Sequence, residues 1–152
     1  MVYKSEMKEG KKNNKVLWFF LTVIMPLALG GIFYFVFCQR IIFVDFIDEL
    51  LGKGHNIIEL PRTGLFVFAR NYGLDGIWAF SLTSFLLIMM GNNKYSLNIS
   101  VLIAIILGAC LEFIQYRGLV NGTFDFFDIM AETIGAISAL IIFLFYRRKE
   151  KK

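Results

Sequence analysis

A long uncharged segment near the start of the chain constrains the fold most strongly. Residues Val16–Phe37 are 22 consecutive positions without a charged side chain. As a helix rising about 1.5 Å per residue, this segment can cross the roughly 30 Å of hydrocarbon in a bilayer. It is longer than the apolar core of a signal peptide and no small-residue cleavage pattern follows, so we expect a retained helix. Pro26 predicts a kink within it.

Three further apolar segments indicate a membrane bundle. A soluble core built from 152 residues could not bury a chain that is 57% hydrophobic. We therefore predict an all-α integral membrane domain over residues 16–146, between tails at 1–15 and 147–152. Its four transmembrane helices are expected at residues 16–37, 74–90, 97–116 and 126–146.

Two segments before the second helix are too short or too polar to span. Residues 40–51 are expected either as an interfacial helix or as an extension of the first helix. Residues 55–73 are expected as a loop that contains one apolar patch. Asp75 is then placed to cap the N-terminus of the second helix.

The basic residues are concentrated at the ends of the chain. Residues 1–15 hold five lysines and two glutamates, residues 147–152 hold five basic residues and one acid, and Lys94 lies in the turn between the second and third helices. The positive-inside rule therefore predicts that both termini are cytoplasmic in a multi-pass plasma membrane protein. This distribution favours the lipid bilayer as the partner, and no nucleic acid is expected.

With this topology, a set of polar side chains lies toward the outer leaflet. The set is Asp75, Glu112, Gln115, Asp125, Asp128 and Glu132. In the fourth helix the acids share a stripe with small residues at 131, 135 and 139, and in the third helix Glu112 shares a sector with Ala104 and Gly108. Small residues let helices approach closely, so we expect these two faces to meet and to form an outward-facing acidic pocket for an extracytoplasmic ligand.

Structural roles for the same acids remain open. Asp125 at the N-cap and Asp128 three residues later match an acidic capping box. Glu112 and Glu132 have either a ligand or a salt-bridge partner, and the arginines expected on that side are Arg62, Arg70 and Arg117.

Metal chemistry is a further alternative. Carboxylates at Glu112, Asp125 and Asp128 would suit Mg²⁺ or Ca²⁺, whereas a zinc site lacks its usual histidine or cysteine ligands. No other cofactor is expected, and the absence of known catalytic motifs favours a protein that is not an enzyme. The alternatives are a metal-dependent membrane enzyme acting on lipid-linked substrates, and a transport or helix-packing subunit with structural carboxylates.

The order of these residues resembles a known family. Glu112-x-x-Gln115, then Gly122-x-x-Asp125-x-x-Asp128 and Gly135, is similar to the signature of VanZ-like membrane proteins. The stretch Gly73–Leu82 is similar to the start of that family's second helix, so the resemblance covers about residues 73–140. It implies a four-span protein of the bacterial cell envelope, with involvement in glycopeptide resistance of the teicoplanin type. The ligand expected for the acidic pocket is a cation or an envelope amphiphile, such as a lipid-linked precursor or a glycolipid.

The chain departs from the family pattern at two positions. Thr123 stands where the family often has arginine, and Glu132 stands where it often has asparagine. The missing arginine argues against a site for an anion, and Glu132 makes the expected pocket more acidic. The resemblance does not predict an oligomeric state.

Overall fold

Four long apolar helices make up most of the regular structure of the described chain. The computed structural model describes residues 14–37, 49–50, 52, 64–90, 93–119 and 124–150. Within these ranges all regular structure is helical, and four helices are long and apolar enough to cross a membrane: Asn14–Phe33, Phe66–Met90, Lys94–Tyr116 and Phe126–Lys149. The predicted all-α, four-span architecture is confirmed.

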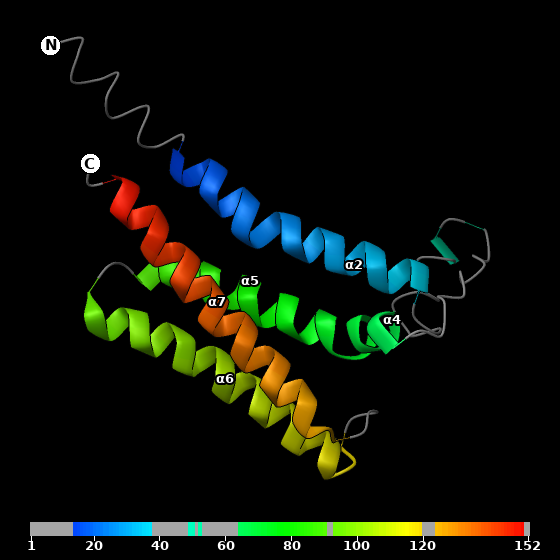
Figure 1. The fold of residues 1–152 in the computed structure, drawn as a ribbon. Coiled ribbons are helices and arrows are strands. Elements are labelled where there is room, and N and C mark those ends of the chain that lie inside the picture. Colours follow the sequence, from blue (N-terminus) through cyan, green and yellow to red (C-terminus); the bar gives the residue numbers. More distant parts are fainter. Residues whose placement is uncertain are drawn as a thin grey trace, which may run out of the picture.

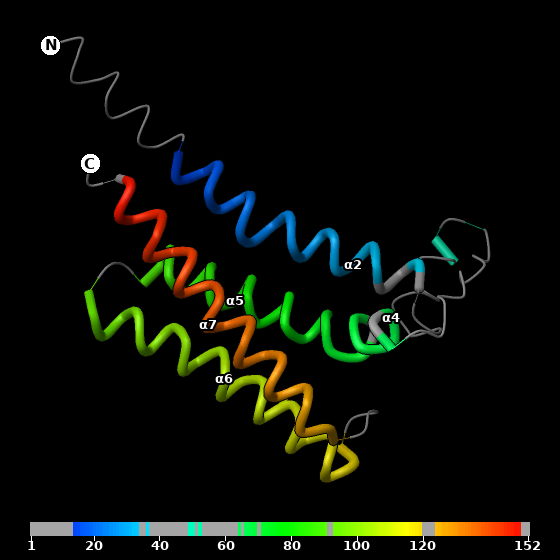
Figure 2. The backbone as a smooth tube through the Cα atoms, in the orientation of Figure 1, coloured from blue at the N-terminus to red at the C-terminus, as the bar shows by residue number. Residues whose placement is uncertain are grey.

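Successive helices run in alternating directions (Figure 1). The first span comprises residues 14–19, η1 (Phe20–Ile24) and α2 (Met25–Phe37); the second comprises α4 (Gly64–Phe68), η2 (Ala69–Gly73) and α5 (Leu74–Met90); α6 (Lys94–Tyr116) and α7 (Phe126–Glu150) follow. The start of the first span and the end of α7 lie at the same end of the bundle, as the tube in Figure 2 also shows. That both ends face the cytoplasm stays a prediction.

The irregularity expected at Pro26 takes the form of a π-helical segment. The segment η1 ends two residues before Pro26, and the Met25 amide donates to the Phe20 carbonyl. The Thr22 hydroxyl donates to the Trp18 carbonyl at 2.9 Å. Because proline has no amide hydrogen and crowds the preceding turn, a widened turn accommodates it within a continuous helix.

The second span begins earlier than the sequence predicted. Residues 64–73, expected as part of a loop, are helical and lead directly into α5. Leu74 has helical dihedral angles, so Asp75 lies inside the helix and the predicted N-cap role is wrong. The loop prediction failed because Arg70, Asn71 and Gly73 interrupt the apolar pattern. The remaining expectations for residues 40–48 and 55–63 lie outside the described residues.

Small and polar side chains fill the interface of α5, α6 and α7. The buried residues of α6 recur at every fourth position and are Ser96, Ser100, Ala104, Gly108 and Glu112. Large apolar side chains such as Leu102 and Ile134 are exposed on the outside. This is the pattern of membrane helices, in which small residues bring backbones close and lipid covers the apolar surface.

The closest crossing joins α5 to α7. A Cβ atom at Gly135 would collide with the backbone carbonyl of Gly76, and one at Gly76 would lie 3.3 Å from the Ala131 carbonyl oxygen. The close approach predicted for the small-residue stripe of the fourth helix is therefore present. Its partner at Gly135 is α5, whereas the sequence had predicted the third helix.

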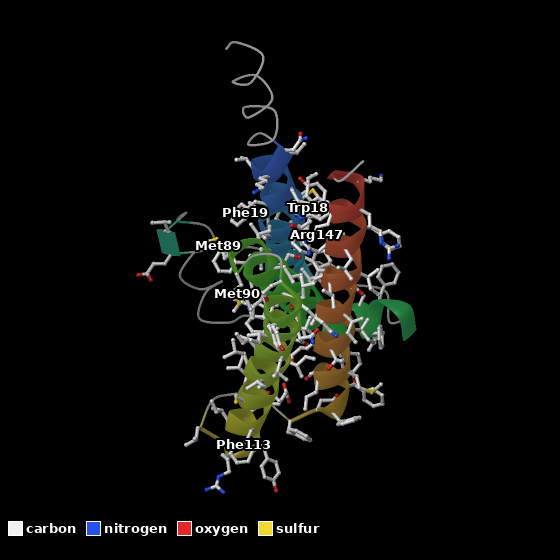
Figure 3. The ribbon with its side chains drawn as sticks, turned by 90° about the vertical axis from the view of Figure 1, so that its left-hand side faces the viewer. Trp18, Phe19, Met89, Met90, Phe113 and Arg147 are labelled. Carbon is white, nitrogen blue, oxygen red and sulfur yellow. The ribbon has the colours of Figure 1, made fainter. Side chains whose placement is uncertain are left out.

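Aromatic stacking joins the first span to the end of α7. The rings of Trp18 and Tyr146 stack with their centroids 4.1 Å apart. Figure 3 shows Trp18 and Arg147 at this end of the bundle and Phe113 at the opposite end. The candidate site lies toward the Phe113 end.

Candidate functional site

The structure gathers five carboxyl groups at one end of the bundle. This acidic cluster consists of Asp75 on α5, Glu112 on α6, and Asp125, Asp128 and Glu132 at the start of α7. Electrostatic interactions connect Asp75 with Glu112, and connect Asp128 and Glu132 with both. The cluster therefore involves three helices, whereas the predicted pocket was placed between the third and fourth alone.

Asp125 caps helix α7, as the sequence predicted. It precedes the helix directly, and its Oδ1 accepts the Phe127 amide at 2.9 Å. Its Oδ2 accepts the Tyr72 hydroxyl at 3.0 Å. Because both oxygens have donors, Asp125 has a sufficient structural explanation.

Glu112, on the neighbouring helix α6, accepts a further backbone amide at the start of α7. Its Oε2 accepts the backbone amide of Asp125 at 3.0 Å, and its side chain is buried. In a capping box, the residue three positions into the helix would accept this amide. The predicted capping-box role of Asp128 is therefore wrong, because Glu112 occupies that position and fastens α6 to α7.

A turn at Gly118 ends α6 on the side of this contact. Gly118 has a φ of +66°, which glycine adopts without steric strain. The Gly118 amide donates to the Gln115 carbonyl at 2.8 Å, and the Leu119 amide donates to the Ile114 carbonyl at 3.2 Å. This is a Schellman motif, which ends α6 and directs the chain away from it.

Asp128 instead turns toward α5. Its carboxyl group interacts electrostatically with that of Asp75, and both residues are partly exposed. The two carboxyl groups therefore interact between α5 and α7, and both have Glu112 as a further acidic neighbour.

Glu132 lies one turn deeper in the membrane span. Its carboxylate occupies the space in which a Cβ atom at position 108 would lie, so Gly108 makes room for it. Its side chain is 6% exposed. Among the described residues its Oε2 atom has no hydrogen-bond partner. The charged groups acting on it are Asp75, Glu112 and Asp128, all acidic.

The remaining predicted partners lie at the edge of the cluster or beyond the described residues. Gln115 is half-buried, and its backbone carbonyl, described above, serves the turn at Gly118. Arg117 is exposed, and its amide donates to the Phe113 carbonyl at the end of α6. Arg62 and the side chain of Arg70 lie outside the described residues, so pairing with them stays a prediction.

Sequence reasoning missed Tyr72. Its hydroxyl donates to Asp125, and its ring lies 5.7 Å from that of Phe127 between centroids. The residue was overlooked because residues 55–73 were interpreted as a loop. The available signal was its position three residues before Asp75, one helical turn away.

A metal site and an outward-facing acidic pocket were also predicted here. In the part of the chain that the structure describes, no group of three or more His, Cys, Asp or Glu residues could hold a metal ion. A surface pocket of about 120 Å³, lined by Ile141, Leu144, Phe145 and Arg148, lies on the other half of α7. The predicted Mg²⁺ or Ca²⁺ site at Glu112, Asp125 and Asp128 gains no support.

Comparison with known proteins identifies no family for this chain. No protein-family model matches the chain, and neither does any curated protein or solved structure. The resemblance to VanZ-like proteins thus stays a prediction from the residues that carry it.

Proposed function

We propose that this chain is a multi-pass protein of the bacterial cell envelope that binds the ammonium group of an amphiphile at the acidic cluster. The observation that carries the proposal is the carboxylate of Glu132, which is buried, has an oxygen without a described hydrogen-bond partner, and lies among other acids. The distribution of basic residues supports an extracytoplasmic location for the cluster.

The charge of the cluster explains why its ligand should be a cation. Two like charges 4 Å apart repel by about 4 kcal/mol at an effective dielectric constant of 20. Burying a charge without a partner is unfavourable by several kcal/mol more. A cation offsets both terms, and an ammonium group brings three N–H donors for oxygens that lack them.

The surroundings of the cluster explain why the ligand should be an amphiphile. Asp75, Glu112, Asp128 and Glu132 all lie within candidate membrane spans. Exposed apolar side chains, including Phe127 and Met130, flank the acids of α7. An amine near the headgroup region, with its apolar tail in the bilayer, meets both surfaces. A lipid-linked precursor or glycolipid that carries an amine belongs to this class.

Thermal unfolding of the full chain in detergent tests this proposal. We expect n-octylamine, protonated at pH 7, to raise the unfolding temperature of the wild type, because a ligand that binds only the folded state stabilises it. The Glu132→Gln variant should show a much smaller rise, and octan-1-ol should produce none in either protein. Equal shifts in the two proteins would overturn the proposal, provided that circular dichroism shows the variant to be helical.

The VanZ-like resemblance supplies a phenotype for the same site. We expect deletion of the gene to lower resistance to teicoplanin-type glycopeptides, and the wild-type gene to restore it. A Glu132→Gln gene expressed at the same level should fail to restore it. Unchanged susceptibility after deletion would remove resistance from the proposal while leaving ammonium binding to the unfolding experiment.

A second candidate, a helix-packing role for the carboxylates, is favoured by one observation. Glu112 and Asp125 both accept backbone amides at the start of α7. These contacts account for two of the five acids without any ligand. They do not account for Glu132, whose Oε2 accepts no described donor.

A further inference from the structure

We infer that the C-terminal half of α7 binds one anionic phospholipid, with part of an acyl chain in the surface pocket of about 120 Å³ and the phosphate group at Arg148. The acidic cluster lies at the start of α7, whereas this pocket lies near its end. The lipid site therefore does not depend on the ammonium ligand proposed above.

The pocket changes from apolar to positive along the axis of α7. It is lined by Ile141, Leu144, Phe145 and Arg148, whose spacing of three or four residues places them on one face of the helix. From the first to the last of them the helix rises about 10 Å, at about 1.5 Å per residue. The three apolar side chains are exposed on the outside of the bundle, and the candidate span ends at Lys149. A phospholipid has the same order, with its tail deep in the membrane and its phosphate group at the surface.

The arginine of the pocket lies beside one of the apolar side chains that line it. Its guanidinium carbon is 6.0 Å from the centroid of the Phe145 ring, which is a cation–π distance. A guanidinium group has N–H donors in a planar fork that matches two oxygens of a phosphate group. Because Phe145 also lines the pocket, its ring would contact the acyl chain while Arg148 binds the phosphate.

Further aromatic and basic side chains gather at this end of the bundle. Trp18 stacks on Tyr146, and Figure 3 shows Trp18 and Arg147 at the same end. Lys15 precedes Trp18 by three residues, about one helical turn, and is exposed. Lys149 follows Tyr146 by the same spacing and is also exposed. Aromatic rings are typical of the membrane interface, and basic side chains there attract anionic lipids. These charges favour a lipid with a net negative headgroup over a zwitterionic one.

The neighbouring arginine has different surroundings. The guanidinium carbon of Arg147 lies 6.0 Å from the centroid of the Phe143 ring. Phe143 is buried in the bundle, whereas Phe145 is exposed. The pocket is lined by Arg148 and not by Arg147. Two adjacent side chains thus carry the same charge, but only one of them lies at the proposed site, so a specific effect on lipid binding can be separated from general attraction.

Native mass spectrometry of the full chain in detergent tests the site. The protein is titrated with dioleoyl-phosphatidylglycerol or with dioleoyl-phosphatidylcholine, which share their acyl chains and differ in headgroup charge. We expect the wild type to bind one phosphatidylglycerol more tightly than phosphatidylcholine. Arg148→Gln should weaken phosphatidylglycerol binding roughly five-fold, which corresponds to about 1 kcal/mol for one basic side chain near an anionic surface. Arg147→Gln removes the same charge outside the pocket and should have a much smaller effect.

A second pair of variants tests the apolar part of the site without a change of charge. Phe145→Ala removes a ring that lines the pocket and should weaken the binding of both lipids. Phe113→Ala removes an equally exposed ring at the opposite end of the bundle and should leave both affinities unchanged. Because each ring is 60% exposed, neither substitution leaves a cavity in the core, and circular dichroism checks that both variants are helical.

Several outcomes would overturn the proposal. Equal affinity of the wild type for the two lipids, or binding of neither, would contradict an anionic lipid site. Equal losses from Arg147→Gln and Arg148→Gln would show general charge attraction in place of a site. Unchanged binding to Phe145→Ala would show that the pocket holds no acyl chain. A wild type that is dimeric without lipid and monomeric after Arg148→Gln would assign the pocket to a second copy of the chain.

Discussion

The two halves of the α5–α6–α7 bundle bury polar side chains in different ways. In the half near the α5–α6 turn, Ser81 donates to the Ile77 carbonyl at 2.9 Å and Ser100 to the Ser96 carbonyl at 2.7 Å. Each of these bonds is made within a single helix, and the Ser100 hydroxyl also donates to the Met90 sulfur of α5 at 3.6 Å. In the other half, the acidic cluster is held by contacts between helices, and Glu132 has an oxygen without a described partner.

This difference follows from what each kind of side chain needs from its neighbours. Hydroxyl groups that bond to their own helix let helices pack closely without needing a partner elsewhere. Buried carboxylates are more unfavourable in a membrane and need partners, protons or ligands. Helix association alone would be served by serine and threonine at both ends. The carboxylates of one end therefore depend on partners that hydroxyl groups do not need.

The largest effect is expected at the crossing of α5 and α7. Gly135→Ala should destabilise the protein by about 3 kcal/mol, the upper end of typical overpacking effects, because the new methyl group meets backbone atoms of Gly76. Gly31→Ala is the matched control: a Cβ there meets nothing within 4 Å. Alanine should leave it unchanged or stabilise it by up to about 1 kcal/mol. Thermal unfolding in one detergent compares them, and equal effects would contradict the crossing.

The next effect separates the structural and ligand roles of Glu112. Glu112→Met removes the acceptor of the Asp125 amide and should destabilise the protein by about 2 kcal/mol. Glu112→Gln keeps an acceptor oxygen and should lose much less. Unfolding temperatures of the two variants provide the measurement. If glutamine proves as damaging as methionine, the negative charge matters more than the hydrogen bond.

A smaller loss of stability is expected at Gly108. A methyl group there meets the side-chain end of Glu132, which can move, so Gly108→Ala should lower stability by only about 1 kcal/mol. It should nevertheless weaken n-octylamine binding, because the displaced carboxylate leaves its position in the cluster. Titration calorimetry tests this, and undiminished binding would show that the position of Glu132 is unimportant.

The smallest effects on stability are expected in the half near the α5–α6 turn, where the buried polar side chains are hydroxyls. Ser100→Ala should lower stability by about 0.6 kcal/mol, the average size of side-chain hydrogen bonds between membrane helices, because its hydroxyl also contacts Met90 of α5. Thr83 has a buried hydroxyl oxygen without a described partner, so Thr83→Val should be neutral or stabilising. Neither change should alter amine binding. A loss of binding in either variant would extend the site into this half and remove the contrast between the two.

Apolar segment length was sufficient to predict four spans, but it could not locate every boundary. The residues before α5 carry Arg70 and Asn71, so hydropathy treated them as loop although their backbone is helical. Helical periodicity correctly placed Gly135 on a contact face. It could not identify the partner helix, because periodicity defines a direction around one helix and contains no information about its neighbour.

The candidate site, like the fold, could be predicted from the sequence only in part. Segregation of the acids toward one end followed from topology, and the N-cap at Asp125 followed from its position before an apolar helix. The sequence could not predict which donor bonds to which carboxylate. Glu112, and not Asp128, accepts the Asp125 amide that the expected capping box would bind, and Asp128 interacts with Asp75 instead. Such competition between residues of different helices depends on distances in space.

The contact between Glu112 and Asp125 has a consequence for the order in which the bundle assembles. It joins residues 13 positions apart and closes a hairpin of two helices. Asp75 and Asp128 are separated by 53 positions, and bringing distant positions together loses more chain entropy. The hairpin can therefore close first with Asp128 still unpaired. Docking of α5 then brings Asp75 to Asp128, so the full acidic cluster exists only in the completed bundle.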